Sequence, residues 1–228
     1  MRCYDSEVCQ LWHRLAPATL VFFTAAGAIY GAPPAIYPYL LSDFRMTEGE
    51  VGMLPTIFQI FWGLSTAPSG LLIQKYGPAA CLRFGVIGIA LVASGYPLAS
   101  ARYHLFILHA LYGVFYSAGG LVVQIVLLNT WFERQPGMAV SVMITGFSFS
   151  GMLWPLVVSL VAERFGWRWG YSTVTWTLWL CAAPLVFFFT KDGPRCSADC
   201  LTPGMFPERL LGRVHGSRRA LADARLIA

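Results

Sequence analysis

Charged residues are scarce in this chain, and acidic residues are the scarcest. Only 12% of the 228 residues are charged, with eleven Asp and Glu against sixteen Lys and Arg. A soluble domain carries about 25% charged residues. The deficit argues against an ordinary soluble enzyme. It also argues against acid proteolysis, because that chemistry needs paired carboxylates and the long apolar stretches contain no Asp or Glu.

Metal-binding and nucleophile motifs are lacking as well. The six cysteines form no Cys-x-x-Cys pair and have no neighbouring His pair, so we expect no metal site and no cofactor. The serine within residues 146–149 is not followed by the glycine that a nucleophile elbow requires, so we expect no catalytic residues and no enzyme activity. The net charge of +5 comes without any recognisable nucleic-acid-binding module, and we expect no nucleic-acid partner.

The chain has long apolar runs instead. Hydrophobic residues make up 57% of it, and the mean hydropathy is +0.59. Because a helix needs about 20 apolar residues to cross the hydrocarbon core, six stretches qualify: 16–41, 51–73, 79–99, 105–131, 138–162 and 169–190. The sequence therefore predicts an all-α integral membrane protein with six transmembrane helices in contact with membrane lipids.

The basic residues around these spans predict the division and orientation of the chain. We expect an amino-terminal tail at 1–17, a six-span region at 18–190, and a basic, disordered tail at 191–228 that is either solvated or bound to anionic headgroups. More Lys and Arg residues lie on the side of the membrane that holds the two termini than on the other side. The first side holds Arg2, Arg14, Lys75, Arg83, Arg134, Lys191 and Arg195, and the other side holds Arg45, Arg102, Arg164 and Arg168. The positive-inside rule then predicts a multi-pass protein with both termini in the cytoplasm. We expect the plasma membrane rather than an organelle.

The loop between the second and third spans carries the most specific motif. Residues 70–77 read Gly-Leu-Leu-Ile-Gln-Lys-Tyr-Gly. This resembles the Gly-x-Leu-x-Asp-Arg-x-Gly signature of the major facilitator superfamily, with Lys75 in the Arg position and Gln74 in place of the Asp. The resemblance implies a cytoplasmic gate formed by Gly70, Leu72, Gln74, Lys75, Gly77 and Arg134.

A second stretch narrows the resemblance. Residues 129–139 are similar to the loop that joins spans four and five in monocarboxylate-transporter-like facilitators, and residues 165–168 (Phe-Gly-Trp-Arg) open the sixth span as in that family. The resemblance covers about residues 18–190. It implies the amino-terminal six-helix half of a major facilitator fold, built as two three-helix repeats. In such proteins the substrate site lies between two halves, near the bilayer midplane.

The function that this resemblance implies is secondary active transport of a small organic anion, of the monocarboxylate type, by alternating access and symport. The chain would supply one half of the transporter, so a second six-helix half or a homodimer would be needed, with a small molecule as substrate. The spans contain no carboxylate to carry a proton. The alternative is a transport-inactive truncated product or a membrane assembly partner.

Candidate residues of the substrate path follow from the resemblance, which implies that spans one, two, four and five border the cavity. Polar groups within hydrocarbon favour the bundle interior or a watery cavity, and helical spacing places several of them on common stripes. The candidates are Tyr30, Pro34, Tyr37, His109, Tyr112, Tyr116, Gln124, Thr145 and Ser148. Hydrogen bonding between helices is the alternative role for them. His109 can titrate near neutral pH, so it is either a proton relay or a packed histidine.

Overall fold

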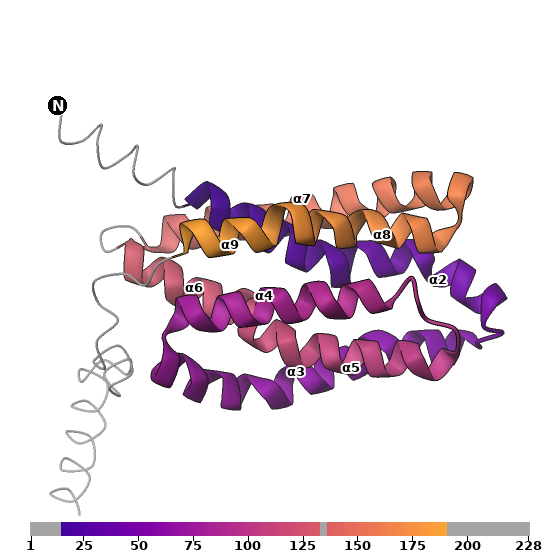
Figure 1. Cartoon of the computed structure of the whole chain (residues 1–228), viewed down its shortest axis with the longest axis horizontal. Coiled ribbons are helices and arrows are strands. Elements are labelled where there is room, and N and C mark those ends of the chain that lie inside the picture. Colours follow the sequence, from indigo (N-terminus) through magenta and orange to yellow (C-terminus); the bar gives the residue numbers. More distant parts are fainter. Residues whose placement is uncertain (1–14, 133–135, 191–228) are drawn as a thin grey trace, which may run out of the picture. The chain divides into compact units, whose positions relative to one another are not determined.

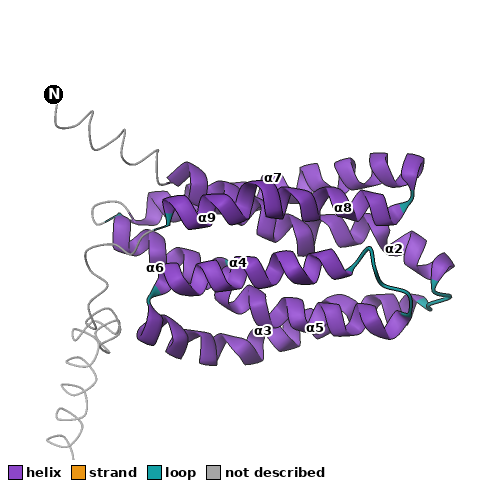
Figure 2. Ribbon diagram, viewed as in Figure 1, coloured by secondary structure: helices purple, strands orange, loops and turns teal. Residues whose placement is uncertain are grey.

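The computed structural model describes residues 15–132 and 136–190, which are helical apart from short turns (Figure 1). Six helical segments within these ranges are long and apolar enough to cross a membrane: Leu15–Asp43, Glu48–Tyr76, Pro78–Gly95, Arg102–Trp131, Pro136–Phe165 and Trp167–Phe188. Each of them overlaps one of the six predicted spans, and Figure 2 shows helices and loops over the same ranges. The all-α membrane fold predicted from hydropathy is therefore confirmed.

The spans are not all single α-helices. The first continues from residues 15–26 through the π-helical turn η1 (Gly27–Gly31) into α2 (Ala32–Asp43). The second is α3 (Glu48–Tyr76), the third α4 (Pro78–Gly95), and the fifth α7 (Pro136–Phe165). The fourth consists of α5 (Arg102–Gly119) and α6 (Leu121–Trp131), and the sixth of α8 (Trp167–Thr177), η2 (Leu178–Ala182) and α9 (Ala183–Phe189). Hydropathy does not predict these interruptions.

Two boundaries follow directly from the sequence. Helix α3 begins at a capping box, in which the backbone N–H of Glu50 donates to Thr47 Oγ1 at 3.3 Å and the N–H of Thr47 donates to Glu50 Oε2 at 2.9 Å. These two bonds satisfy donors that the first turn of a helix leaves free. Helix α4 ends at Gly95, before the predicted residue 99, because Pro97 has no N–H to continue the helical ladder.

The two three-helix repeats share one turn geometry. Gly77 joins α3 to α4 with φ 83° and ψ 156°, and Gly166 joins α7 to α8 with φ 89° and ψ 158°. In both turns the glycine N–H donates to a carbonyl oxygen four residues earlier at 2.9 Å, on Ile73 and Ala162. Only glycine adopts this backbone conformation without strain. The same turn between the second and third helix of each repeat agrees with half of a major facilitator fold.

Glycines bring the helices of the first repeat and the fourth span into direct backbone contact. A β-carbon on Gly85 of α4 would lie 2.2 Å from the backbone nitrogen of Gly119 in α5, and one on Gly113 of α5 would lie 2.6 Å from the carbonyl oxygen of Phe58 in α3. Small residues allow membrane helices to approach closely and gain van der Waals contact. In this way α5 lies against both α3 and α4, as Figure 1 shows.

Two of the six spans remain largely uncovered. In the most apolar window of α3, and likewise of α7, only 17% of the residues are buried, whereas the corresponding values are 67% for the first span and 61% for the fourth. Helices α3 and α7 are as long as the buried spans, so their exposure comes from their position in the fold. Their outer faces are therefore the part of the described structure that is free to contact a ligand or a partner.

Candidate functional site

An aromatic cluster assembles where the first span meets α3, α5 and α7. The ring of Tyr30 lies 5.5 Å from Phe58, 6.1 Å from Tyr116 and 5.4 Å from Phe147, and the interplanar angles are 89°, 72° and 74°. All three contacts are edge-to-face, the arrangement that the ring quadrupole favours. Four spans therefore meet around one side chain, Tyr30, which is itself partly exposed. We call these four residues the Tyr30 cluster.

The nine predicted path residues divide into two groups by exposure. Those on the outer side of the half are partly or fully exposed: Tyr30, Pro34, Tyr37, Thr145 and Ser148. The others are buried: His109, Tyr112, Tyr116 and Gln124. The Tyr30 cluster joins the two groups, because the ring of Tyr116 contacts that of Tyr30 edge-to-face while Phe147 shares α7 with Thr145 and Ser148.

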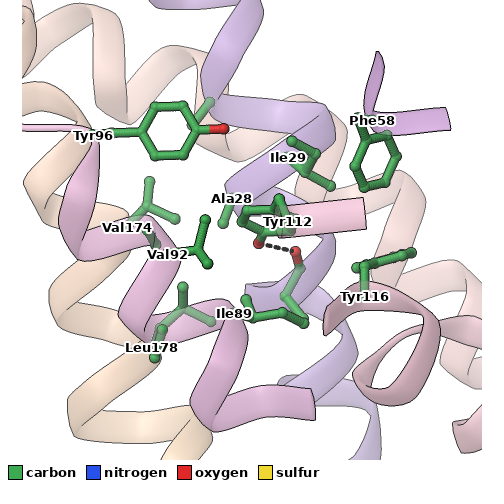
Figure 3. Packing of buried hydrophobic residues seen from close by; sticks show 14 of the residues in the cluster. Ala28, Ile29, Phe58, Ile89, Val92, Tyr96, Tyr112, Tyr116, Val174 and Leu178 are labelled. Carbon is green, nitrogen blue, oxygen red and sulfur yellow. Dashed lines mark hydrogen bonds between the residues drawn. The ribbon is translucent and has the colours of Figure 1, made fainter. Parts of the chain in front are cut away.

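Tyr112 anchors the first span from within the core. Its hydroxyl donates to the carbonyl oxygen of Ala25 at 3.1 Å, and Tyr171 of α8 donates to that of Ala28 at 2.9 Å. Ala28 lies within the π-helical turn η1 and Ala25 lies two residues before it, and such turns often mark functional positions in helices. Figure 3 shows Tyr112 in the buried cluster beside Ala28. The two hydroxyls therefore tie the first span to α5 and α8.

His109 is buried in the core and is 1% exposed. Its Nδ1 lies 2.9 Å from the carbonyl oxygen of Leu105 and 3.1 Å from the hydroxyl of Tyr96, and Tyr96 stacks on Tyr171 at 4.5 Å. Among the residues that the structure describes, Nε2 has no hydrogen-bond partner. The imidazole links α5 to the residue that follows α4, at the junction with α8.

Gln124 sits at the break in the fourth span. Gly120 has φ −94° and ψ −150°, which separates α5 from α6, and the Gln124 Nε2 donates to the carbonyl oxygen of Gly119 at 3.3 Å. Its Oε1 is buried and is unpaired within residues 15–132 and 136–190. The amide therefore supports the interrupted backbone from inside the half.

The exposed faces of α3 and α7 carry neutral polar groups and no formal charge over most of their length. Residues 51–74 and 136–162 contain no Asp, Glu, Lys or Arg. On α7 the hydroxyl of Thr145 donates to the carbonyl oxygen of Ser141 at 3.0 Å, and Ser148 follows on the same exposed face. On α3 the exposed amide of Gln59 lies beside Tyr30. The surface can therefore form hydrogen bonds without supplying an ion pair.

Four residues at this site are not among the candidates predicted from the sequence: the buried Phe58, the partly buried Trp62, and the exposed Gln59 and Phe147. Trp62 stacks on Phe58 at 6.1 Å and meets Tyr116 edge-on at 5.7 Å. Two signals were present in the sequence. Phe58 and Trp62 have the four-residue spacing that places side chains on one helix face, and Gln59 is the only amide side chain within residues 51–73.

The gate motif lies at the end of the bundle where α3 turns into α4. Gly77 forms the turn itself, whereas Gly70 faces open space, since a β-carbon there would meet no other atom of the described chain within 4 Å. Leu72, Gln74 and Lys75 are exposed, and the ammonium of Lys75 lies 5.2 Å from the ring centre of Tyr76. Arg134 lies outside the described residues.

Charged residues gather at the opposite end. Asp43 Oδ2 accepts a hydrogen bond from Trp167 Nε1 at 2.7 Å and lies 3.9 Å from the guanidinium of Arg168. Arg168 also donates to the carbonyl oxygen of Ala99 at 3.2 Å and lies 4.8 Å from the ring centre of Trp167. These contacts join the first repeat to the start of α8 in the second repeat.

Comparisons with known proteins place these features in a family. The family model of the Major Facilitator Superfamily matches residues 18–200. The chain is 28% identical over 137 residues to the membrane sensor protein UhpC of Salmonella typhimurium, covering 60% of this chain and 31% of that protein. It is 30% identical over 158 residues to monocarboxylate transporter 3 of Mus musculus, and this match covers 65% of this chain and 31% of the transporter.

A further relative is the fujikurins efflux protein of Gibberella fujikuroi, with 24% identity over 139 residues, covering 60% of this chain and 29% of the relative. The match to each of these relatives spans about 30% of the relative's length. The family model nevertheless extends over all six spans of the described structure. The chain belongs to the Major Facilitator Superfamily, and its six helices correspond to the amino-terminal half of that fold.

Proposed function

We propose that the chain forms one half of a secondary transporter that moves a small organic anion of the monocarboxylate type by alternating access. The observation that carries this proposal is the uncovered, uncharged face of α3 and α7 around the Tyr30 cluster. A transport site near the bilayer midplane requires polar groups between two helical bundles. The similarity to a monocarboxylate transporter supports the choice of substrate.

The transporter would be completed by a second six-helix half or by a second copy of the chain. Alternating access requires one bundle to rock against another around the bound substrate, and α3 and α7 are the helices left free for this contact. A second bundle would also supply a cation or a proton-carrying carboxylate, because residues 51–74 of α3 and 136–162 of α7 contain neither. Symport with a proton would depend on that bundle, or on His109.

The proposal is tested by reconstituting the full chain into liposomes, first alone and then co-expressed with the carboxyl-terminal six-helix half of a monocarboxylate transporter. We expect saturable lactate or pyruvate uptake from the paired assembly and none from a preparation shown to be monomeric. Uptake by the monomer would contradict the need for a second half. Loss of uptake in His109→Gln, with expression and pairing unchanged, would support proton relay by His109.

A transport-inactive membrane protein is the second candidate function, and one observation favours it. Two of the relatives, from Salmonella typhimurium and Escherichia coli, are named as membrane sensor proteins. A six-helix bundle of this family would then act as an assembly partner in the membrane. Stable pairing with a second half, without uptake of any monocarboxylate tested, would support this candidate over transport.

Orientation is part of the proposed function, because the gate motif acts from the cytoplasm. We propose cytoplasmic termini and a plasma-membrane location, so that the loop at residues 42–50 faces outward. A single cysteine at the exposed Ser42, introduced into a chain without other cysteines, should react with an impermeant thiol reagent on intact cells. Reaction only after permeabilisation would overturn this orientation.

A further inference from the structure

We propose that the Tyr30 cluster recognises an aromatic ring, so that the preferred substrate is an aromatic monocarboxylate rather than a short aliphatic one. This inference rests on the proposed function and refines its substrate class. It starts from the position of Tyr30, which contacts an aromatic residue from each of three other spans and still remains partly exposed.

The geometry of the cluster supports ring recognition. The three neighbours of Tyr30 contact it at angles of 72° to 89°, so its orientation is fixed from three sides. Phe147 is 36% exposed on the outward face of α7. A ring that enters on this face meets Tyr30 and Phe147 together, and aromatic rings prefer offset or edge-to-face contact with such partners. A saturated ring of the same size gains no quadrupole interaction.

The polar groups beside the cluster suit a carboxylate that is bound through hydrogen bonds. Gln59 is exposed next to the Tyr30 hydroxyl, and its amide N–H groups and that hydroxyl are donors. Ser148 adds a hydroxyl on the α7 side. Residues 51–74 and 136–162 offer no cation for an ion pair. Affinity for a substrate on this half must therefore come from its apolar body as well as from its charge.

The alternative occupant of this face is lipid or a packed helix, in which case the cluster has no ligand preference. A binding measurement separates these possibilities. The full chain in lipid nanodiscs is titrated with three probes: phenylacetate, cyclohexylacetate and 2-phenylethanol. The first two share the carboxylate and differ in aromaticity, and the third keeps the ring but has no charge. Quenching of tryptophan fluorescence reports binding, because Trp62 stacks on Phe58 in the cluster.

We expect phenylacetate to bind about three- to tenfold more tightly than cyclohexylacetate, which corresponds to one or two aromatic contacts. Tyr30→Leu and Phe147→Leu should remove this preference. Gln59→Leu should weaken both carboxylates alike, by about tenfold, and leave their ratio unchanged. The control is Phe165→Leu, which removes an exposed ring at the far end of the same helix α7 and should change neither affinity.

Each outcome bears on one of the two proposals. Equal binding of phenylacetate and cyclohexylacetate, or no saturable binding of any probe, would overturn the aromatic preference and leave the anion transporter proposal to its uptake test. Binding of 2-phenylethanol as tight as that of phenylacetate would support ring recognition and contradict the anion as substrate. Thermal unfolding of each variant in nanodiscs tests whether the variant is folded, and an unchanged unfolding temperature assigns a loss of binding to the site. Tyr30→Phe keeps the ring and should retain the preference for phenylacetate.

Discussion

Helices α3 and α5 have opposite relationships to the rest of the molecule, although they pack against each other. Helix α3 is the second span and α5 is the first part of the fourth, yet few residues of α3 are buried, while α5 contributes Tyr112, Tyr116 and His109 to the core. Glycines show the same contrast, because Gly113 of α5 presses against the backbone of α3 whereas Gly63 of α3 faces open space. Hydropathy identifies both helices as spans but does not distinguish the one that needs a partner.

This difference separates two uses of an apolar helix. The spans around α5 are covered within the half, and the hydroxyls of Tyr112 and Tyr171 find their acceptors there, on the first span. Helices α3 and α7 expose part of their polar and aromatic groups, including Gln59, Thr145, Phe147 and Ser148. In a membrane, exposed groups such as Gln59 remain costly unless a cavity or a partner receives them.

The largest expected effect breaks the close packing in the core. Gly85→Leu would force a side chain into the backbone of Gly119, since even a β-carbon would lie 2.2 Å from its nitrogen. We expect a loss of more than about 3 kcal/mol of unfolding free energy, measured by denaturant titration in mixed micelles. The matched control is Gly63→Leu on α3, which has no atom within 4 Å of a β-carbon and should unfold like the parent chain. Similar losses in both variants would contradict the contrast between α3 and the core.

A smaller effect concerns the hydroxyl groups that hold the first span. Tyr112→Phe and Tyr171→Phe keep the rings and remove only the bonds to Ala25 and Ala28. We expect each substitution to lower the unfolding free energy by about 0.6–1.7 kcal/mol in the same denaturant titration, the range for hydrogen bonds between membrane helices. The control is Tyr103→Phe, because Tyr103 is 59% exposed and its hydroxyl should contribute nothing measurable. An unchanged stability in all three would show that the first span is held by packing alone.

Most of the fold could be predicted from the sequence, because the spans depend on local composition. Runs of about 20 apolar residues define each helix, and Gly77 and Gly166 mark the turns in which positive φ is required. The interruptions could not be predicted. Nothing in the composition of residues 27–31 specifies a π-helical turn, and the break at Gly120 depends on how α5 and α6 pack.

The candidate site was less predictable for a related reason. A stripe such as Tyr30, Pro34 and Tyr37 follows from helical spacing, and the structure places all three on the part of the first span that is not buried. Phe58 and Phe147 look like any apolar residue in a span, and their role depends on long-range contacts with Tyr30. His109 and Gln124 look functional because they are polar, yet both are enclosed within the half. Their part in transport stays a prediction.

The smallest expected effect lies at the ends of the helices, where solvent weakens electrostatic contacts. The guanidinium of Arg102 lies 3.2 Å from the carboxylate of Glu50, with side chains 59% and 29% exposed. An exposed ion pair of this kind contributes about 0.2–1 kcal/mol. A double-mutant cycle with Glu50→Gln and Arg102→Gln should give a coupling energy in this range, and raising the salt concentration should reduce it further.

Glu50 also offers an internal comparison, because the same carboxylate closes the capping box of α3 by accepting from the N–H of Thr47. Glu50→Gln retains an acceptor for that bond and removes only the charge, so the cycle isolates the ion pair. Glu50→Ala removes both interactions and should lower the unfolding free energy by about 1 kcal/mol more than Glu50→Gln does, which is the usual contribution of a helix cap. If Arg102→Gln alone destabilised the chain as much as Tyr112→Phe, the end of the bundle would be as tightly coupled as its core. The contrast between exposed and buried contacts would then fail.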